Sequence, residues 1–239
     1  MSANAAATVV ILCPEPALAL QWRELLTTAS GLRVAGISNS PSSVRAMVKQ
    51  HGVDLILADL RMLQGTRNGA LRSLRSAGSE DTPLIVVVGD RLDDPLLLDA
   101  LRGGADNFHV PGPNPFALAE AVQRTLDGES FIEPAIAAQV LDLFDRTAPQ
   151  GNDDPLSNNT LLLTAPERSL LVRVAQGRTV EQIAEAEATA PRHLGALVRS
   201  AYRKLRWNLR ANALSLEEDQ SFRDSGWAAL QPGRRNPRG

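Results

Sequence analysis

The sequence has little of what marks secreted, metal-binding or membrane-spanning proteins. Cys13 is the single cysteine in 239 residues, so no internal disulfide can form. With one cysteine and three histidines, the chain shows no metal-ligand spacing. The N-terminus lacks a basic segment, and its apolar run is too short to span a bilayer. These absences predict a soluble cytoplasmic protein, not bound to a membrane, with no metal or other cofactor.

The sequence lacks a glycine-rich loop motif and has few aromatic residues. No glycine-rich phosphate-binding loop of the Walker or Rossmann type is present, and Gly103-Gly104 is typical of a helix end. Aromatic residues make up only 4% of the chain, but the hydrophobic fraction of 44% allows a sizeable aliphatic core. The chain length favours two domains over one.

Apolar strand-like segments alternate with helix-like segments through the first half of the chain. Each of five short apolar runs is followed by a segment with helical spacing. This alternation predicts an α/β domain over residues 8–130, a doubly wound, flavodoxin-like parallel sheet with helices on both faces. The expected strands are Val9–Leu12, Leu32–Ile37, Asp54–Leu60, Pro83–Val88 and Asn107–Val110, and the expected helices are Ala17–Thr28, 41–52, Asn68–Ala77, Pro95–Leu101 and Pro115–Leu126.

The second half has helical periodicity and no strand pattern. A linker over residues 131–160 is expected to contain a helix at Ala135–Arg146 and the flexible tether "TAPQGNDDPLSNNT". An all-α, four-helix domain is predicted over 161–218, and a disordered tail over 219–239. Its expected helices are Ala165–Gln176, Val180–Ala188, Pro191–Arg206 and Leu209–Glu218.

Basic residues gather in the predicted helical domain. Residues 161–216 contain nine Arg and Lys against four Glu, a balance of +5, whereas the whole chain has a net charge of −2. Pro191 suits a first helical position, and the helix that it opens has basic side chains largely off its apolar stripe. In a helix-turn-helix, such a second helix lies in the major groove of double-stranded DNA. The candidate DNA contacts are Arg192, His193, Arg199, Arg203 and Lys204.

Three segments of the helical domain carry a family resemblance: "LTAPERSLLVRVAQGRTVEQIAE", "LVRSAYRKLRW" and "RANAL". They resemble the LuxR-type helix-turn-helix, and the preceding domain resembles the receiver of a two-component response regulator, so the resemblance covers residues 8–216. It implies a DNA-binding transcriptional regulator, not an enzyme, that forms a homodimer on two-fold operator sites. The resemblance places the subunit contacts in the receiver or in Leu209–Glu218. Gly195 departs from the family, which commonly has a DNA-contacting lysine at this position.

The receiver-like domain departs further from its family at the phosphorylation site. The resemblance places the phosphoacceptor at Asp59, in "DLILADLRM". A receiver also needs an acidic pair for Mg²⁺, and a hydroxyl and an ammonium for the phosphoryl oxygens. Because those residues are replaced, we expect an atypical, orphan regulator with a pseudo-receiver that works without phosphorylation. The replacements are Cys13 and Pro14 for the acidic pair (with Glu15 one residue beyond), Gly89 or, with the register shifted by one, Val88 for the Ser or Thr, and Pro111 for the Lys.

Several alternatives stay open at this point. Asp59 is either the acceptor of a working phospho-switch or a strand-end residue that caps backbone amides. The helical domain either binds DNA or has become a protein-interaction module. Cys13 is either a thiolate sensor or a small buried residue, and His193 either touches DNA or caps its helix. A small ligand or a regulatory protein would supply the signal to the receiver-like domain.

Overall fold

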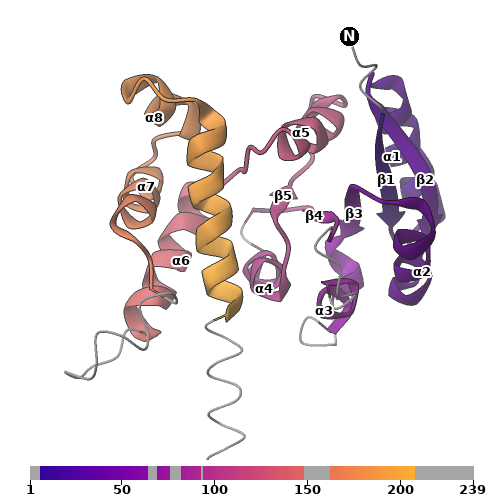
Figure 1. Cartoon of the computed structure of the whole chain (residues 1–239), viewed down its shortest axis with the longest axis horizontal. Helices are drawn as coiled ribbons and strands as arrows, with labels where there is room; N and C mark the ends of the chain where they lie inside the picture. The colour runs from indigo at the N-terminus through magenta and orange to yellow at the C-terminus, as the bar shows by residue number, and fades with distance from the viewer. Residues whose placement is uncertain (1–5, 64–68, 76–81, 93, 148–161, 208–239) are drawn as a thin grey trace, which may run out of the picture.

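Five parallel strands form one sheet in the order β2-β1-β3-β4-β5 (Figure 1). The strands are β1 (Ala7–Leu12), β2 (Leu32–Ser38), β3 (Leu55–Asp59), β4 (Leu84–Val88) and β5 (Asn107–His109). This strand order is that of the flavodoxin-like, doubly wound fold, which confirms the expected fold class. The computed structural model describes residues 6–63, 69–75, 82–92, 94–147 and 162–207.

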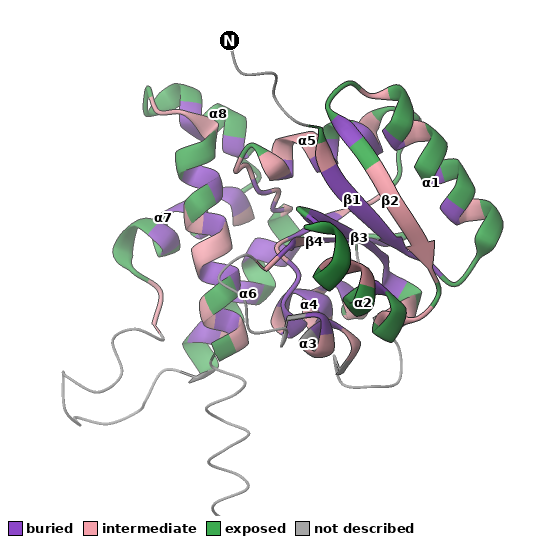
Figure 2. Ribbon diagram, turned by 45° about the vertical axis from the view of Figure 1, so that its right-hand side comes forward, coloured by how far each residue is buried: buried purple, intermediate pink, exposed green. Residues whose placement is uncertain are grey.

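Five helices cover the sheet: α1 (Pro16–Thr28), α2 (Pro41–His51), α3 (Gly69–Arg75), α4 (Pro95–Gly103) and α5 (Ala117–Leu126). Val9 and Ile11 of β1 pack in the layer of α1 and α5, whereas Val10 and Leu12 pack in the layer of α2, α3 and α4. Figure 2 shows the buried central strands between helices whose outer faces are exposed. Burial on both faces is why these strands are continuous apolar runs.

Local sequence signals set the helix boundaries. Gly52 closes α2 in the left-handed conformation, at a φ of 57°. The 3₁₀ helix η1 (Leu60–Leu63) follows β3 directly, so the strand is shorter than expected. Helix α5 begins at Ala117, later than expected, because Asn114 Oδ1 accepts the Phe116 N–H (3.0 Å) in a preceding turn.

The rest of the described chain is helical: α6 (Pro134–Thr147), α7 (Ala165–Ala175), α8 (Val180–Ala186) and a helix over 191–207. Ile136, Val140 and Phe144 of α6 are buried in one apolar cluster with Leu170 and Val174 of α7. The expected linker helix therefore packs against the helices that follow it. The expected helix Leu209–Glu218 lies outside the described residues. Within the described part of the chain, no helix has the length and apolar character needed to cross a bilayer.

Candidate functional site

Asp59 lies at the carboxyl end of β3 and is held by Arg61. The Asp59 carboxylate is buried, with 3% of the residue exposed. The Arg61 guanidinium contacts both of its oxygens, with Nε 3.0 Å from Oδ1 and Nη2 2.7 Å from Oδ2. The backbone N–H of Arg61 also donates to Oδ1 (2.8 Å), so Asp59 caps a backbone amide as one expectation had it. Asp59 raises the pKa of Arg61, so this arginine stays charged.

Glu15 brings a second carboxylate to the same guanidinium. This residue precedes α1, and its Oε2 lies 3.5 Å from Nη1 of Arg61. Arg61 therefore lies between the buried carboxylate of Asp59 and the half-exposed carboxylate of Glu15. A guanidinium suits this position because its fork of donors matches carboxylate geometry. Sequence reasoning missed Arg61, although its place two residues after Asp59 is a signal for such a local contact.

Cys13 lies beside this ion pair at the end of β1. The residue is 2% exposed, and its Sγ is 3.4 Å from the Glu15 carbonyl oxygen and 3.7 Å from Asp59 Oδ2. Burial raises the pKa of the Cys13 thiol, Asp59 raises it further, and the Glu15 hydrogen bond and Arg61 oppose this. The thiol is protonated at neutral pH and is a poor nucleophile.

The donor atoms around Asp59 do not fit a Mg²⁺ ion. Magnesium requires near-octahedral oxygen ligands, usually including carboxylates that no other cation holds. Asp59 and Glu15 both contact Arg61, Cys13 offers a protonated thiol, and exposed Pro14 has no side-chain donor. Arg61 is therefore the cation that contacts both of these carboxylates.

Gly89 and Pro111, at the Ser or Thr and Lys positions, lie at the ends of β4 and β5. A Cβ at Gly89 would lie 3.0 Å from Cδ2 of Leu60 and 3.3 Å from Cδ2 of Leu97, so leucine side chains fill this space. Pro111 is exposed and lines a cavity between α1 and the segment after β5. The structure thus gathers Cys13 and Asp59 closely and leaves Pro111 outside their contacts.

The helix over 191–207 presents basic side chains at its surface. Arg192, His193 and Arg203 are exposed. The imidazole Nδ1 of His193 lies 3.4 Å from Thr189 Oγ1, in the turn before the helix. At about 100° per residue, four arginines fall within about 60° of arc around the helix axis. We call them the arginine stripe: Arg192, Arg199, Arg203 and Arg206.

Lys204 forms an ion pair within the helical part. Its Nζ lies 2.7 Å from Oε2 of Glu167, whose side chain is 3% exposed. Glu167 Oε2 also accepts the Thr164 N–H (2.6 Å) at the start of α7. Burial would raise the pKa of Glu167, but the Lys204, Ser200 and Thr164 hydrogen bonds outweigh it and lower this pKa. Lys204 thus holds the helix over 191–207 to α7, a role that sequence reasoning did not assign.

The same helix lies against the segment between α5 and α6, and we call this the docking contact. Gly195 is buried there: a Cβ would be 2.8 Å from Ser130 N and 2.9 Å from Gly128 O. The Tyr202 hydroxyl donates to the Phe131 carbonyl (3.2 Å), and burial raises the pKa of Tyr202. Gly195, where the resemblance implies a DNA-contacting lysine, is therefore covered by the chain's own backbone.

Arginine side chains complete the docking contact on both sides. Arg199 is half-buried with a guanidinium nitrogen beside Gly128; burial lowers its pKa, and Asp106 opposes this. Arg124 of α5 forms ion pairs with Glu129 (2.5 Å) and with Glu181 of α8. The α/β part and the segment after it thus contact the helix over 191–207 at Gly195, Arg199 and Tyr202, and Arg124 contacts α8 through its ion pair with Glu181.

The sheet order and the strand-end aspartate define a receiver-like domain, and α7, α8 and the helix over 191–207 have the order of a helix-turn-helix. Over 208 residues the chain is 27% identical to the nitrate/nitrite response regulator protein NarP of Escherichia coli strain K12, covering 87% of this chain and 93% of NarP. It is 29% identical over 179 residues to the DNA-binding transcriptional activator DevR/DosR of Mycobacterium tuberculosis strain H37Rv, covering 73% and 79%. These similarities confirm the resemblance to response regulators.

Solved structures of response regulators also align with the chain. The NarL receiver domain of Mycobacterium tuberculosis aligns with a TM-score of 0.46 and 19% identity, covering 52% of this chain and 99% of that one. A LuxR-family DNA-binding response regulator from Silicibacter pomeroyi aligns with a TM-score of 0.44 and 27% identity, covering 54% and 98%. No family model matches the chain.

Proposed function

We propose that this chain is a DNA-binding transcriptional regulator whose receiver-like domain works without phosphorylation. The observation that carries DNA binding is the arginine stripe on the second helix of the helix-turn-helix. Similarity to NarP and DevR/DosR, which are named as regulators, supports the same function. The proposed partners are double-stranded DNA and a second copy of the chain, and the proposal assigns no enzymatic activity.

Phosphate contacts dominate the proposed interaction. Arg192 and Arg203 are exposed, and arginines that neutralise phosphates release counterions from the duplex. Gly195 offers no side chain to a base edge, so we expect sequence discrimination to rest on fewer direct contacts. Because the docking contact covers Gly195 and part of Arg199, DNA binding by this face requires the helical part to leave the segment between α5 and α6.

A salt titration tests DNA binding. Duplexes selected from a random pool are labelled, and anisotropy gives the affinity across salt concentrations for the wild type, Arg203→Ala and Arg146→Ala. Arg203→Ala is expected to weaken binding and to reduce the slope of log affinity against log salt by about 0.9 for each bound copy, hence by about 1.8 for two copies on one site. Arg146 of α6 is an exposed arginine outside the stripe, so its variant is the control. Absence of binding at low salt, or equal slopes for all three proteins, overturns the assignment of DNA binding. A separate sedimentation experiment on the complex measures whether two copies of the chain bind each duplex.

Phosphorylation independence is supported by the contacts of Asp59. A phosphoacceptor must attack with a free carboxylate oxygen, beside a metal ion that neutralises the transferring group. Both oxygens of Asp59 contact Arg61, and the donor set around it does not fit Mg²⁺. We propose that the Arg61 guanidinium replaces the metal ion as a permanent positive charge beside Asp59. The charge around Asp59 then stays the same, because neither a metal ion nor a phosphoryl group is added to it.

Mass spectrometry after incubation with acetyl phosphate and Mg²⁺ tests this second part. Neither the wild type nor Asp59→Asn is expected to gain the mass of a phosphoryl group during the incubation. A phosphoryl gain in the wild type that Asp59→Asn abolishes would establish the alternative, a working phospho-switch. A third variant, Arg61→Ala, tests whether removal of the guanidinium is enough to let Mg²⁺ bind beside Asp59. Its matched control is Arg33→Ala, which removes an exposed arginine outside this site.

A further inference from the structure

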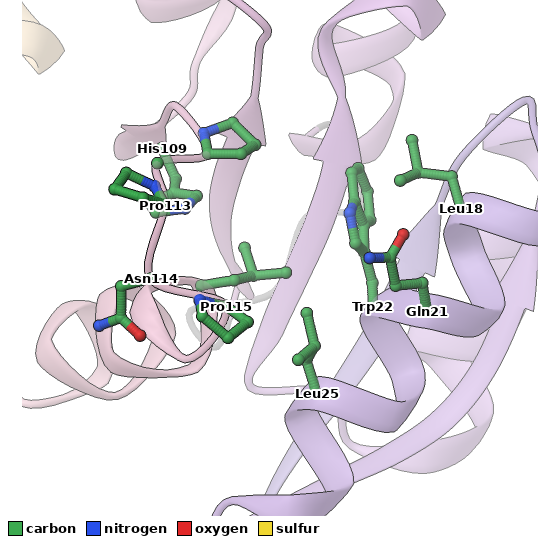
Figure 3. A pocket seen from close by; sticks show the side chains of 11 residues that line it. Leu18, Gln21, Trp22, Leu25, His109, Pro113, Asn114 and Pro115 are labelled. Carbon is green, nitrogen blue, oxygen red and sulfur yellow. The ribbon is translucent and has the colours of Figure 1, made fainter.

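A cavity of about 280 Å³ opens between α1 and the segment that follows β5 (Figure 3). Leu18, Leu25 and Leu118 form its apolar part, and Pro111, Pro113 and Pro115 form much of the opposite side. Its volume is near the lower end of the range for small-molecule pockets. The cavity lies on the α1 and α5 side of the sheet, outside the contacts of Asp59 and the docking contact.

Three prolines give one side of this cavity a fixed shape and few donors. The stretch Pro111-Gly112-Pro113-Asn114-Pro115 has a proline at every second position, and each ring fixes its own φ. These prolines have no backbone N–H, so the only hydrogen-bond donors of this stretch belong to Gly112 and Asn114. A site whose wall is rigid before binding loses less conformational entropy when it is filled.

Trp22 supplies a hydrogen-bond donor on the opposite side. The residue is only 4% exposed, and Figure 3 shows its indole nitrogen turned toward the proline segment across the cavity. Among the described residues, the Trp22 N–H has no acceptor. Its nitrogen is not among the buried polar atoms that lack a partner, so this N–H is accessible from the cavity, where an acceptor on an occupant can pair with it.

The cavity lining has no charged side chain to attract an ion. Among the described residues that line it, none is Asp, Glu, Lys or Arg. His109 is half-buried there, and burial lowers its pKa, which keeps the imidazole neutral at physiological pH. A charged ligand would lose its hydration without gaining an opposite charge.

We infer that this cavity binds a small, uncharged organic molecule with a hydrogen-bond acceptor that pairs with the Trp22 N–H. The leucine and proline side chains contact the apolar part of the molecule, and Gln21, His109 and Asn114 provide further polar groups. The inference does not depend on DNA binding, because its test measures occupancy of the cavity alone.

Two fluorescent probes test the inference: Prodan, an uncharged naphthyl ketone, and dimethylaminonaphthalene, which lacks the ketone. We expect the full chain to bind one Prodan per copy with saturation in the micromolar range. Trp22→Phe, which removes the N–H and keeps an aromatic ring, is expected to weaken Prodan binding about two- to tenfold and to leave the other probe unchanged. Trp207→Phe makes the same chemical change at an exposed position outside the cavity and is the control.

Leu18→Arg, which fills the cavity and adds a charge, is expected to abolish binding of both probes. If Leu18→Arg does not fold, Gln21→Arg is used in its place, because Gln21 lines the cavity at an exposed position. No saturable binding by the wild type, equal binding by the filled variant, or equal effects of Trp22→Phe on both probes each overturn the inference. A fourth outcome also overturns it: no probe binds, and sedimentation shows a wild-type dimer that Leu18→Arg disrupts. In that case a second copy of the chain occupies the cavity.

Discussion

Replacing Gly195 by alanine should open the docking contact without unfolding either part of the chain. The added Cβ would lie 2.8 Å from Ser130 N, 2.9 Å from Glu129 Cα and 2.9 Å from Gly128 O. All three are backbone atoms, so no side-chain rotation can relieve the overlap. Overpacking of this kind costs about 1–3 kcal/mol, and it applies only to the docked arrangement. A difference of that size shifts the docking equilibrium about 5- to 150-fold toward separation.

Helix propensity acts on Gly195→Ala in a different way. Alanine stabilises a helix interior by about 1 kcal/mol relative to glycine. This gain is present whether or not the helix is docked, so it cancels in the docking equilibrium and adds to the stability of the helical part. The two effects therefore separate: the helical part resists denaturant as well as or better than the wild type, while the docking contact is lost.

Hydrogen exchange and X-ray scattering measure the outcome. We expect faster exchange of backbone amides in the segment 128–132 and a larger radius of gyration for Gly195→Ala. Under the proposed function, its affinity for selected duplex DNA also rises. Gly112→Ala is the control, because a Cβ there has no atom within 4 Å. Unchanged exchange and size in a folded Gly195→Ala protein would show that the helix does not approach this backbone, and would refute the reasoning.

Two other contacts give predictions on stability. Lys204→Met leaves the buried Glu167 carboxylate unpaired and is expected to lower the free energy of unfolding by about 3 kcal/mol in urea titrations, whereas the exposed neighbour Arg203→Met changes it by less than about 0.5 kcal/mol. Because the folded-state pKa of Glu167 is lowered, its contribution is present above about pH 4.5 and is lost as the pH falls further; a wild-type stability that is flat through this range argues against the pair. Burial lowers the pKa of His109 in the folded chain, so its contribution to stability is complete above about pH 6.5. Below that pH the unfolded chain is protonated at His109 before the folded chain, and the free energy of unfolding falls. Between pH 7.5 and 5.0, His109→Gln is therefore expected to lose less of this free energy than the wild type.

The sheet was predictable from the sequence because its signals are local. Runs such as Val86-Val87-Val88 are apolar at every position, as strands buried on both faces must be. Boundaries were less predictable where a turn competes: β3 ends where η1 begins, and the Asn114 side chain delays the start of α5. The expected order of strands and helices nevertheless places Cys13 and Asp59 at one edge of the sheet, where the structure has them.

The candidate sites were only partly predictable because their decisive contacts need three-dimensional proximity. From the sequence, Gly195 is the loss of a lysine; only the structure brings the backbone of residues 128–130 against it. Lys204 has the same sequence features as its neighbour Arg203, yet one holds a buried carboxylate and the other is exposed. Periodicity places such residues on a helix face, but it cannot identify a partner from a distant part of the chain.

Asp59 and Gly195 share one physical feature: each is contacted by another group of the same chain. The Arg61 guanidinium contacts the Asp59 carboxylate, and the backbone of residues 128–130 lies against Gly195, which under the proposed function would face DNA. Under the proposed function, a ligand that promotes DNA binding must bind the separated arrangement more tightly than the docked one. His109 lines the cavity between α1 and the segment after β5, and it also lines a second cavity bounded by Phe131, a residue of the docking contact. Because linkage is reciprocal, a molecule in the first cavity changes the docking equilibrium by the ratio of its affinities for the docked and the separated arrangements. Its affinities for the wild type and for Gly195→Ala, measured side by side, give that ratio.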